Sequence, residues 1–206
     1  MNNQIEQMLK DIPQLEPCGG DVQRAFESLA ACFRGGGKLL LAGNGGSASD
    51  CEHWAGELLK SFRNPRLPGA SDAEKLGPEL AGKIQGGLPA IPLPSLVSFS
   101  TAWNNDCDPE FMFAQGVWAL GAENDILVAL STSGNSANVV RAAQAAVARG
   151  MKVIGLTGEG GGRLAELCEV SIKVPECEVY RVQQLHLPVY HCLCMMLEDE
   201  FFPNKS

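Results

Sequence analysis

The sequence has no surplus of basic residues: 16 Lys and Arg stand against 24 Asp and Glu, a formal net charge of -8. A broad surface for nucleic acid or for an anionic membrane needs the opposite balance, so we expect neither partner. There is no run of about 18 apolar residues, which a membrane-spanning helix needs, and no basic stretch followed by an apolar one near the start. These absences predict a cytoplasmic protein.

Several motifs are also missing. None of the eight cysteines forms a C-x-x-C pair, which favours reduced, mostly buried thiols over a disulfide framework or a cysteine metal site. Neither G-x-G-x-x-G nor G-x-x-x-x-G-K-[ST] occurs, so the sequence indicates neither a dinucleotide nor a nucleoside triphosphate.

What is present is a regular alternation of elements. Apolar runs at 38–43, 88–93, 125–130, 152–158 and 170–175 alternate with stretches of helical periodicity. Such alternation predicts an α/β fold, with a parallel sheet covered by helices on both faces. The 206 residues suit one domain over 1–206, opened by helices within 1–34.

One stretch, 64–89, interrupts this alternation. It is rich in Pro and Gly and is longer than the roughly 12 to 15 residues at which connections in compact domains become unusual. We interpret it as an inserted surface loop or lid, with a short helical piece around 78–84.

Two loops follow predicted strands and carry glycine and serine at the start of the next helix. The first, GNGGSASD at 43–50, includes Gly45, Gly46 and Ser47, and the second is STSGNS at 131–136. Backbone amides at a helix N-terminus suit an anion, and the carboxyl ends of neighbouring parallel strands bring such loops together. Each loop alone fits ordinary turn chemistry equally well. Together they favour a local phosphate site.

The three histidines are few enough for their positions to be informative. His53 and Glu57 lie four residues apart, about 40° around a helix, so both can point into one pocket. On the last predicted helix, Gln183 and His191 are about 80° apart, whereas His186 and His191 are about 140° apart. Pro188 between them should kink that helix. The alternatives are a surface pair at His53 and a core histidine at His191.

Five motifs, GNGGSASDCEHWAGE, NND, STSGNSANVV, LTGEGGGRL and RVQQLHLPVYH, together resemble the sedoheptulose 7-phosphate isomerase (phosphoheptose isomerase) family of SIS domains. The resemblance implies a flavodoxin-like doubly wound sheet and a homotetramer with active sites between subunits. It implies a divalent metal, usually zinc, on His53, Glu57, Gln183 and His191, with Glu57 and His191 as the catalytic acid/base pair. The expected substrate contacts are Asn44, Gly45, Gly46, Ser47, Asn105, Asp106, Ser131, Thr132, Ser133, Ser136 and Gln183.

Two departures leave the substrate open. The 64–89 segment is longer than the usual family loop, and Lys60 and Ser61 stand where typical members carry Gly-Arg. We therefore expect a ketose-aldose isomerase, for sedoheptulose 7-phosphate or for a different sugar phosphate.

A non-enzymatic alternative remains. The tail HCLCMMLEDEFFP is similar to an SIS branch that binds the bacterial replication initiator, although that branch lacks the glutamate and histidine present here as Glu57 and His191. A sugar-phosphate sensor would need an attached regulatory domain, for which the length leaves little room.

Overall fold

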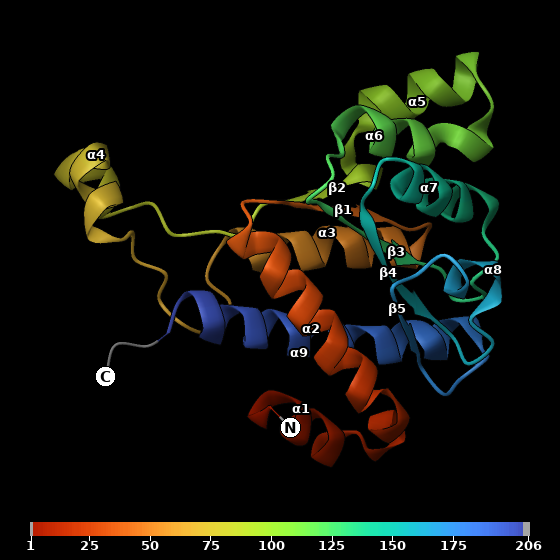
Figure 1. The fold of residues 1–206 in the computed structure, drawn as a ribbon, viewed down its shortest axis with the longest axis horizontal. Coiled ribbons are helices and arrows are strands. Elements are labelled where there is room, and N and C mark those ends of the chain that lie inside the picture. Colours follow the sequence, from red (N-terminus) through yellow and green to blue (C-terminus); the bar gives the residue numbers. More distant parts are fainter. Residues whose placement is uncertain (1, 204–206) are drawn as a thin grey trace.

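The computed structural model describes residues 2–203 and forms one parallel five-stranded sheet with helices on both faces (Figure 1). The strands are β1 (Leu39–Ala42), β2 (Ala90–Pro92), β3 (Ile126–Leu130), β4 (Lys152–Thr157) and β5 (Val170–Lys173). Their order is β2-β1-β3-β4-β5, with every neighbouring pair parallel. This is the flavodoxin-like order, so the predicted fold class is confirmed.

The strands are apolar along their whole length because both faces of the sheet are covered. Leu39 and Leu41 point to one face, whereas Leu40 points to the other, and all three are fully buried. Register follows from this pairing, with Leu39 opposite Ile126 and Leu41 opposite Val128. The edge strand β2 is shorter than predicted and ends at Pro92, which has no N–H to donate to a ladder.

Two groups of helices complete the layers. On the Leu39 face lie α1 (Asn3–Asp11), α2 (Gly19–Arg34), α3 (Gly46–Leu59) and α9 (Val179–Phe201), with the 3-10 segment Pro13–Cys18 between α1 and α2. On the Leu40 face lie α6 (Met112–Leu120), α7 (Ala137–Ala148) and α8 (Gly162–Ala165). Helix α5 (Val97–Asp106), between the 3-10 turns Leu93–Ser95 and Pro109–Phe111, rests on this second layer through Phe99 and Trp103.

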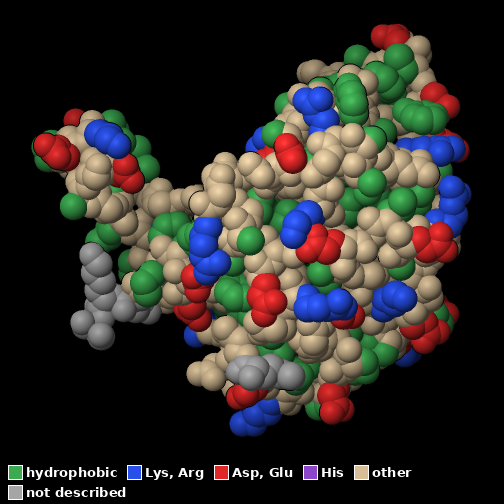
Figure 2. Space-filling model, viewed as in Figure 1, with side chains coloured by type: hydrophobic (Ala, Val, Ile, Leu, Met, Phe, Trp, Pro, Cys, Tyr) green, Lys and Arg blue, Asp and Glu red, His purple; other side chains and the backbone are tan. Residues whose placement is uncertain are grey.

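The segment 64–89 forms an arm that stands away from the rest of the protein (Figure 2). It carries α4 (Ala70–Ala81), none of whose residues is buried. The helix covers an earlier stretch than the predicted 78–84, and its φ of 72° at Gly77 separates a first piece from a second that begins at Pro78.

Helix α9 runs as one element of 23 residues through Pro188, so the expected kink does not interrupt it. Most of its apolar residues are buried within this chain against α1, α2 and α3, with Val179, Tyr180 and Leu187 exposed. Of the helices in residues 2–203, none is both long and apolar enough to cross a membrane. The cysteines in this part of the chain are all free, and five of the eight are buried.

Candidate active site

The two glycine- and serine-rich loops meet at the carboxyl ends of β1 and β3. These strands are neighbours, and the chain order reverses between them, which is where ligands bind in open α/β sheets. A reciprocal pair of hydrogen bonds, each 2.9 Å, joins the side-chain amides of Asn44 in the first loop and Asn138 in the first turn of α7. The predicted meeting of the loops is therefore present in the fold.

The first loop turns into α3 through Gly45, whose φ is 54°. A Cβ at Gly46 would lie 2.7 to 2.9 Å from the side-chain amide of Gln183, so the absence of a side chain there lets α9 approach α3 closely. Gln183 is thereby in contact with the first loop. Asn44, Gly45 and Gly46 are exposed, but Ser47 is buried in the first turn of α3.

The second loop is preorganised by its own hydroxyls. The Oγ atoms of Ser131 and Ser136 lie 3.0 Å apart, and the Ser133 Oγ accepts the N–H of Asn135 at 3.1 Å. Ser133 is exposed and Thr132 half-buried, immediately before the N-terminus of α7. Hydroxyls and the first amides of a helix therefore lie within six residues, which suits an anion.

His53 is held by a series of hydrogen-bonded groups that starts at a half-buried carboxylate, Asp50. Tyr190 donates its hydroxyl to the Asp50 Oδ1 at 3.3 Å and lies 2.9 Å from the His53 Nδ1. Because an ionised carboxylate can only accept, the Tyr190 oxygen is left to accept a proton from Nδ1. This arrangement places the lone pair of neutral His53 on Nε2. That atom faces the Glu57 Oε1 at 3.3 Å.

Burial shifts the pKa of two groups in this hydrogen-bonded series, Asp50 and Tyr190. It raises the pKa of the Asp50 carboxyl, although the Tyr190 hydrogen bond acts in the opposite direction. It also raises the pKa of the Tyr190 phenol, with a further contribution from Asp50. Tyr190 therefore stays protonated and serves as a fixed link between Asp50 and His53.

His191 lies next to this group. Its ring centre is 5.0 Å from that of His53 and 5.3 Å from that of Phe62. Burial lowers the pKa of His191, the neighbouring His53 lowers it further, and Glu57 acts against both. Its Nε2 is buried and has no hydrogen-bond partner within residues 2–203. A neutral imidazole with an unused nitrogen is available for proton transfer or for a metal.

His186, the other histidine on α9 in the described chain, is part of the protein core. It is fully buried and its Nε2 lies 3.3 Å from the carbonyl oxygen of Thr157. Burial lowers its pKa to about 4, so it is neutral at physiological pH.

Comparison with known proteins identifies the family of the chain. The chain is 40% identical over 186 residues to the phosphoheptose isomerase of Rhodospirillum rubrum, which covers 90% of this chain and 89% of that protein. It is 37% identical over 204 residues to that of Shewanella denitrificans, with 98% and 94% covered. The chain belongs to the phosphoheptose isomerase family.

Solved structures of the phosphoheptose isomerase family have the same fold. That from Francisella tularensis superposes with a TM-score of 0.78 at 30% identity, covering 94% of each chain. That from Neisseria gonorrhoeae gives 0.73 at 33% identity, covering 95% of this chain and 91% of the other. A model of the SIS domain matches residues 67–158, which include the second loop but neither His53 nor His191.

Two of the residues suggested by the family motifs form no hydrogen bond with the others in the described part of the chain. Asn105 and Asp106 form the exposed end of α5, and their only side-chain hydrogen bond in the described chain joins the two at 2.7 Å. Neither contacts Gly46, His53 or the second loop through a hydrogen bond or ion pair in residues 2–203.

The donors around His53 fit a divalent metal by chemistry. Two imidazoles and a carboxylate are zinc ligands, and tetrahedral ligands about 2.0 to 2.2 Å from zinc stand roughly 3.3 to 3.5 Å apart, similar to the 3.3 Å between His53 and Glu57. When His53 is neutral, its Nε2 and the Glu57 Oε1 are both hydrogen-bond acceptors. Two acceptors that face each other at this distance favour a cation between them. Within residues 2–203, however, no three His, Cys, Asp or Glu side chains already converge as a ligand set.

Sequence reasoning missed Asp50 and Tyr190. Asp50 lies one turn before His53 on the same helix, a spacing visible in the sequence. For Tyr190 no local spacing gives a signal, and only the packing of α9 against α3 reveals that its hydroxyl reaches His53.

Proposed function

We propose that this chain interconverts a phosphorylated ketose and its aldose, with sedoheptulose 7-phosphate and a heptose 7-phosphate as the preferred pair, in the cytoplasm. The observation that carries the proposal is the grouping of Glu57, His53 and His191 beside two anion-suited loops. The names of the relatives support the same reaction.

Isomerisation needs two kinds of proton transfer. From the ketose, a proton leaves C1 and one is added at C2, while O1 loses a proton and O2 gains one. We assign the transfers at carbon to Glu57 and those at oxygen to His191, whose buried Nε2 has no other partner in the described chain. Each well-placed acid or base contributes on the order of 10² to 10⁴ in rate.

The lowered pKa of His191 suits its role. A histidine that stays neutral at pH 7 can accept a proton from one hydroxyl and return it to the next oxygen. Activity should consequently fall on the acid side only below the ordinary histidine pKa of about 6.5.

Neutral groups would bind the negatively charged phosphate of the substrate. The hydroxyls and amides from Ser131 to Ser136, at the start of α7, would hold the phosphate, and Asn44 to Gly46 would contact the sugar. An anion held by amides needs no lysine, which fits a chain of net charge -8.

His53, Glu57, Gln183 and His191 would hold a divalent metal, with zinc favoured by the two imidazoles. When bound, the ion would supply Lewis-acid polarisation of the sugar carbonyl. Asp50 and Tyr190 would fix the His53 tautomer for this purpose.

We further propose a homotetramer with active sites between subunits. The position of Asn105 and Asp106, exposed and away from Glu57, fits a role in the site of a neighbouring copy. A different sugar phosphate is the second candidate substrate, because the Lys60 Nζ lies 3.1 Å from the Glu57 Oε2 where typical members have Gly-Arg.

The test is a screen of purified protein, with and without added zinc, against five-, six- and seven-carbon ketose phosphates. Glu57→Gln keeps the size of the side chain but cannot accept a proton from carbon, so turnover should drop by at least about 10². His191→Asn should be similarly inactive. Retention of activity within about tenfold in Glu57→Gln would rule out Glu57 as the base. A wild type that turns over none of these sugars would favour a binding protein.

A further inference from the structure

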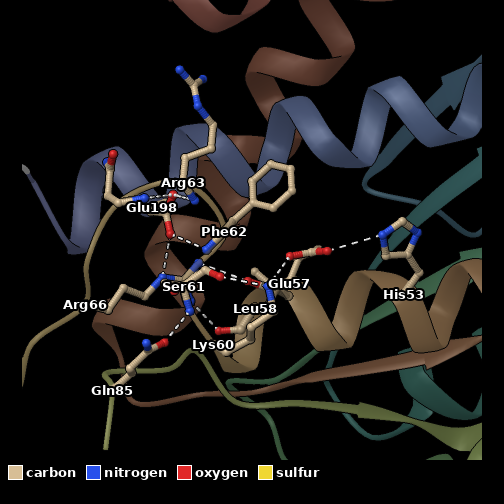
Figure 3. A network of polar contacts seen from close by, with 11 residues as sticks. His53, Glu57, Leu58, Lys60, Ser61, Phe62, Arg63, Arg66, Gln85 and Glu198 are labelled. Carbon is tan, nitrogen blue, oxygen red and sulfur yellow. Dashed lines mark hydrogen bonds and ion pairs between the residues drawn. The ribbon is translucent and has the colours of Figure 1, made fainter. Parts of the chain in front are cut away.

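Near the start of the inserted arm, an arginine binds the end of the helix that carries Glu57. Arg66 is 1% exposed, and its Nη1 and Nη2 donate to the carbonyl oxygens of Leu58 at 2.7 Å and Glu57 at 2.9 Å (Figure 3). The last carbonyls of a helix have no partner within the helix and carry partial negative charge. Arg66 therefore fixes the backbone of Glu57 itself.

The returning end of the arm is anchored at the same place. The N–H of Leu88 donates to the Leu58 oxygen at 2.8 Å, and the N–H of Gly86 donates to the Arg66 oxygen at 2.6 Å. The ring of Phe202 covers the Arg66 guanidinium at 4.9 Å. Both ends of the arm are thus fixed to α3, although α4 between them has no buried residue.

Arg66 is held in turn by a carboxylate on α9. The Arg66 Nε donates to the Glu198 Oε1 at 2.8 Å, and both side chains are buried. The same carboxylate accepts three successive backbone amides, from Phe62 at 2.7 Å, Arg63 at 2.7 Å and Asn64 at 2.9 Å (Figure 3). Glu198 therefore holds the whole turn between α3 and Arg66.

This carboxylate lies on the same side of α9 as His191. The two are seven residues apart, which at 3.6 residues per turn leaves them within about 20° of each other. Phe62, whose N–H is bound to Glu198, also packs its ring against His191. One set of contacts thus connects the backbone of Glu57 to the helix face that carries His191.

We infer that Arg66 and Glu198 are positioning residues, which set the end of α3 against α9 so that Glu57 and His191 act on one substrate. Within residues 2–203, neither forms a hydrogen bond or ion pair with the side chain of His53, Glu57 or His191. The inference rests on the proposed function, and the arm contributes through its anchored base, independently of α4.

The test compares Arg66→Lys with a matched control, Asp125→Asn. Lysine keeps the charge beside Glu198 but cannot fork to two carbonyls. Asp125 is likewise a buried carboxylate that accepts from a lysine, Lys38, and from the backbone amides of Lys38 and Ala122. It precedes β3, and its partners Lys38 and Ala122 belong to neither α3, the arm nor α9. Both variants are assayed well below their melting temperatures.

For Arg66→Lys we expect kcat to fall about 10- to 100-fold, with KM changed by less than about threefold, since small misplacements of catalytic groups have effects of this size. Zinc affinity should fall about tenfold, because ligands on two helices lose their relative position. Asp125→Asn should lose stability while retaining kcat and zinc affinity.

Equal kcat and equal zinc affinity for the two variants at matched folded fraction would overturn the inference and leave the pair a purely structural one. If the wild type turns over no sugar phosphate, the proposed function fails. Zinc affinity then decides the positioning role by itself: a loss confined to Arg66→Lys supports it, and no difference refutes it. Glu198→Gln, the more disruptive change, should produce the same pattern.

Discussion

At the scale of single residues, the orientation of His53 depends on two neighbouring side chains, Asp50 and Tyr190. The Asp50 carboxylate orients the Tyr190 hydroxyl, and the hydroxyl selects which nitrogen of His53 is free. Tyr190 also stacks on Trp54 with ring centres 5.4 Å apart, which keeps its position independent of the hydroxyl. The ring and the hydroxyl can thus be separated by mutation.

We predict that Tyr190→Phe weakens zinc binding about 10- to 100-fold while the protein stays folded, because the phenylalanine ring keeps the stacking and loses only the link to His53. Competition with a chromophoric chelator measures the affinity. Tyr180→Phe is the matched control, since the hydroxyl of that exposed tyrosine bonds only to Arg181 within residues 2–203. Identical zinc affinities in both variants would show that the hydrogen bonds from Asp50 through Tyr190 to His53 do not affect zinc binding.

The limits of sequence reasoning are also clearest at this scale. The i,i+4 spacing of His53 and Glu57 follows from helical geometry, so their contact could be predicted. The bonds from Tyr190 to His53 and from Arg66 to Glu198 join residues 137 and 132 positions apart. No local spacing encodes them, because they exist only once α9 has packed against α3.

At the scale of elements, the loop from Ser131 to Ser136 works as a unit at the start of α7. Ser133→Ala and Ser136→Ala should each reduce the rise in melting temperature produced by inorganic phosphate or a sugar phosphate, because ligand stabilisation follows affinity. Thermal melts over a ligand titration measure the effect. Ser71→Ala, on the exposed surface of α4, should behave as wild type. A phosphate response unchanged in both loop variants would remove this loop from the binding site.

The turn that joins α3 to the arm makes folding sensitive to acid through Glu198. Burial raises the pKa of this carboxyl, but the amides of Phe62, Asn64 and Arg63 together with Arg66 outweigh it, so its pKa is lowered. Its stabilising contribution is therefore complete above the ordinary glutamate pKa of about 4.3 and is lost as the pH falls toward the lowered value.

Glu198→Gln should consequently be less stable than wild type by about 3 to 5 kcal/mol at pH 7, and the difference should shrink below about pH 4.3. Urea unfolding at pH 7, 5, 4 and 3.5 measures it. Replacing the exposed Glu74 by glutamine should give curves close to wild type throughout. A difference that stays constant down to pH 3.5 would contradict the assignment of this acid sensitivity to Glu198.

The elements themselves were predictable where periodicity is strong, and less so where tertiary contacts decide. Each predicted strand is present because continuous apolar runs of this length require burial on both faces. Helix α4 begins earlier than expected, since the Gly and Pro that suggested a break lie inside the element and mark its division at Gly77. Pro188 is accommodated within α9, where packing on three helices outweighs one missing hydrogen bond.

At the scale of the whole molecule, exposed apolar side chains bear on the proposed self-association. The apolar last helix is satisfied within the chain, as Val189, Leu193 and Leu197 are fully buried. Large apolar side chains are instead exposed around α5 and α6 and along the arm, with Val97 at 65%, Trp118 at 50% and Leu67 at 76%. Where such residues form one contiguous patch, they are candidates for the contacts of the proposed assembly.

Light scattering at micromolar concentration should therefore give a mass of about four times the 21.9 kDa chain. Replacing Trp118 and Val97 by glutamate should lower that mass, whereas Leu187→Glu, at an exposed position on α9, serves as a control for added charge. A mass near 21.9 kDa for the wild type would contradict the proposed assembly and leave Asn105 and Asp106 without a role in a neighbouring site.

Helix α9 is the last element of the described chain to be synthesised, and it packs against the first helix. The first and last helices lie against each other, with Gln4 bonded to Asp199 at 2.9 Å, and α9 carries Gln183, His191 and Glu198 (Figure 1). At about 5 to 20 residues per second, a ribosome needs roughly 10 to 35 s to reach this helix. Throughout that interval the Leu39 face of the sheet has only α1, α2 and α3 to cover it, so a chain that terminates early exposes apolar surface and yields an aggregation-prone fragment instead of a weakened enzyme.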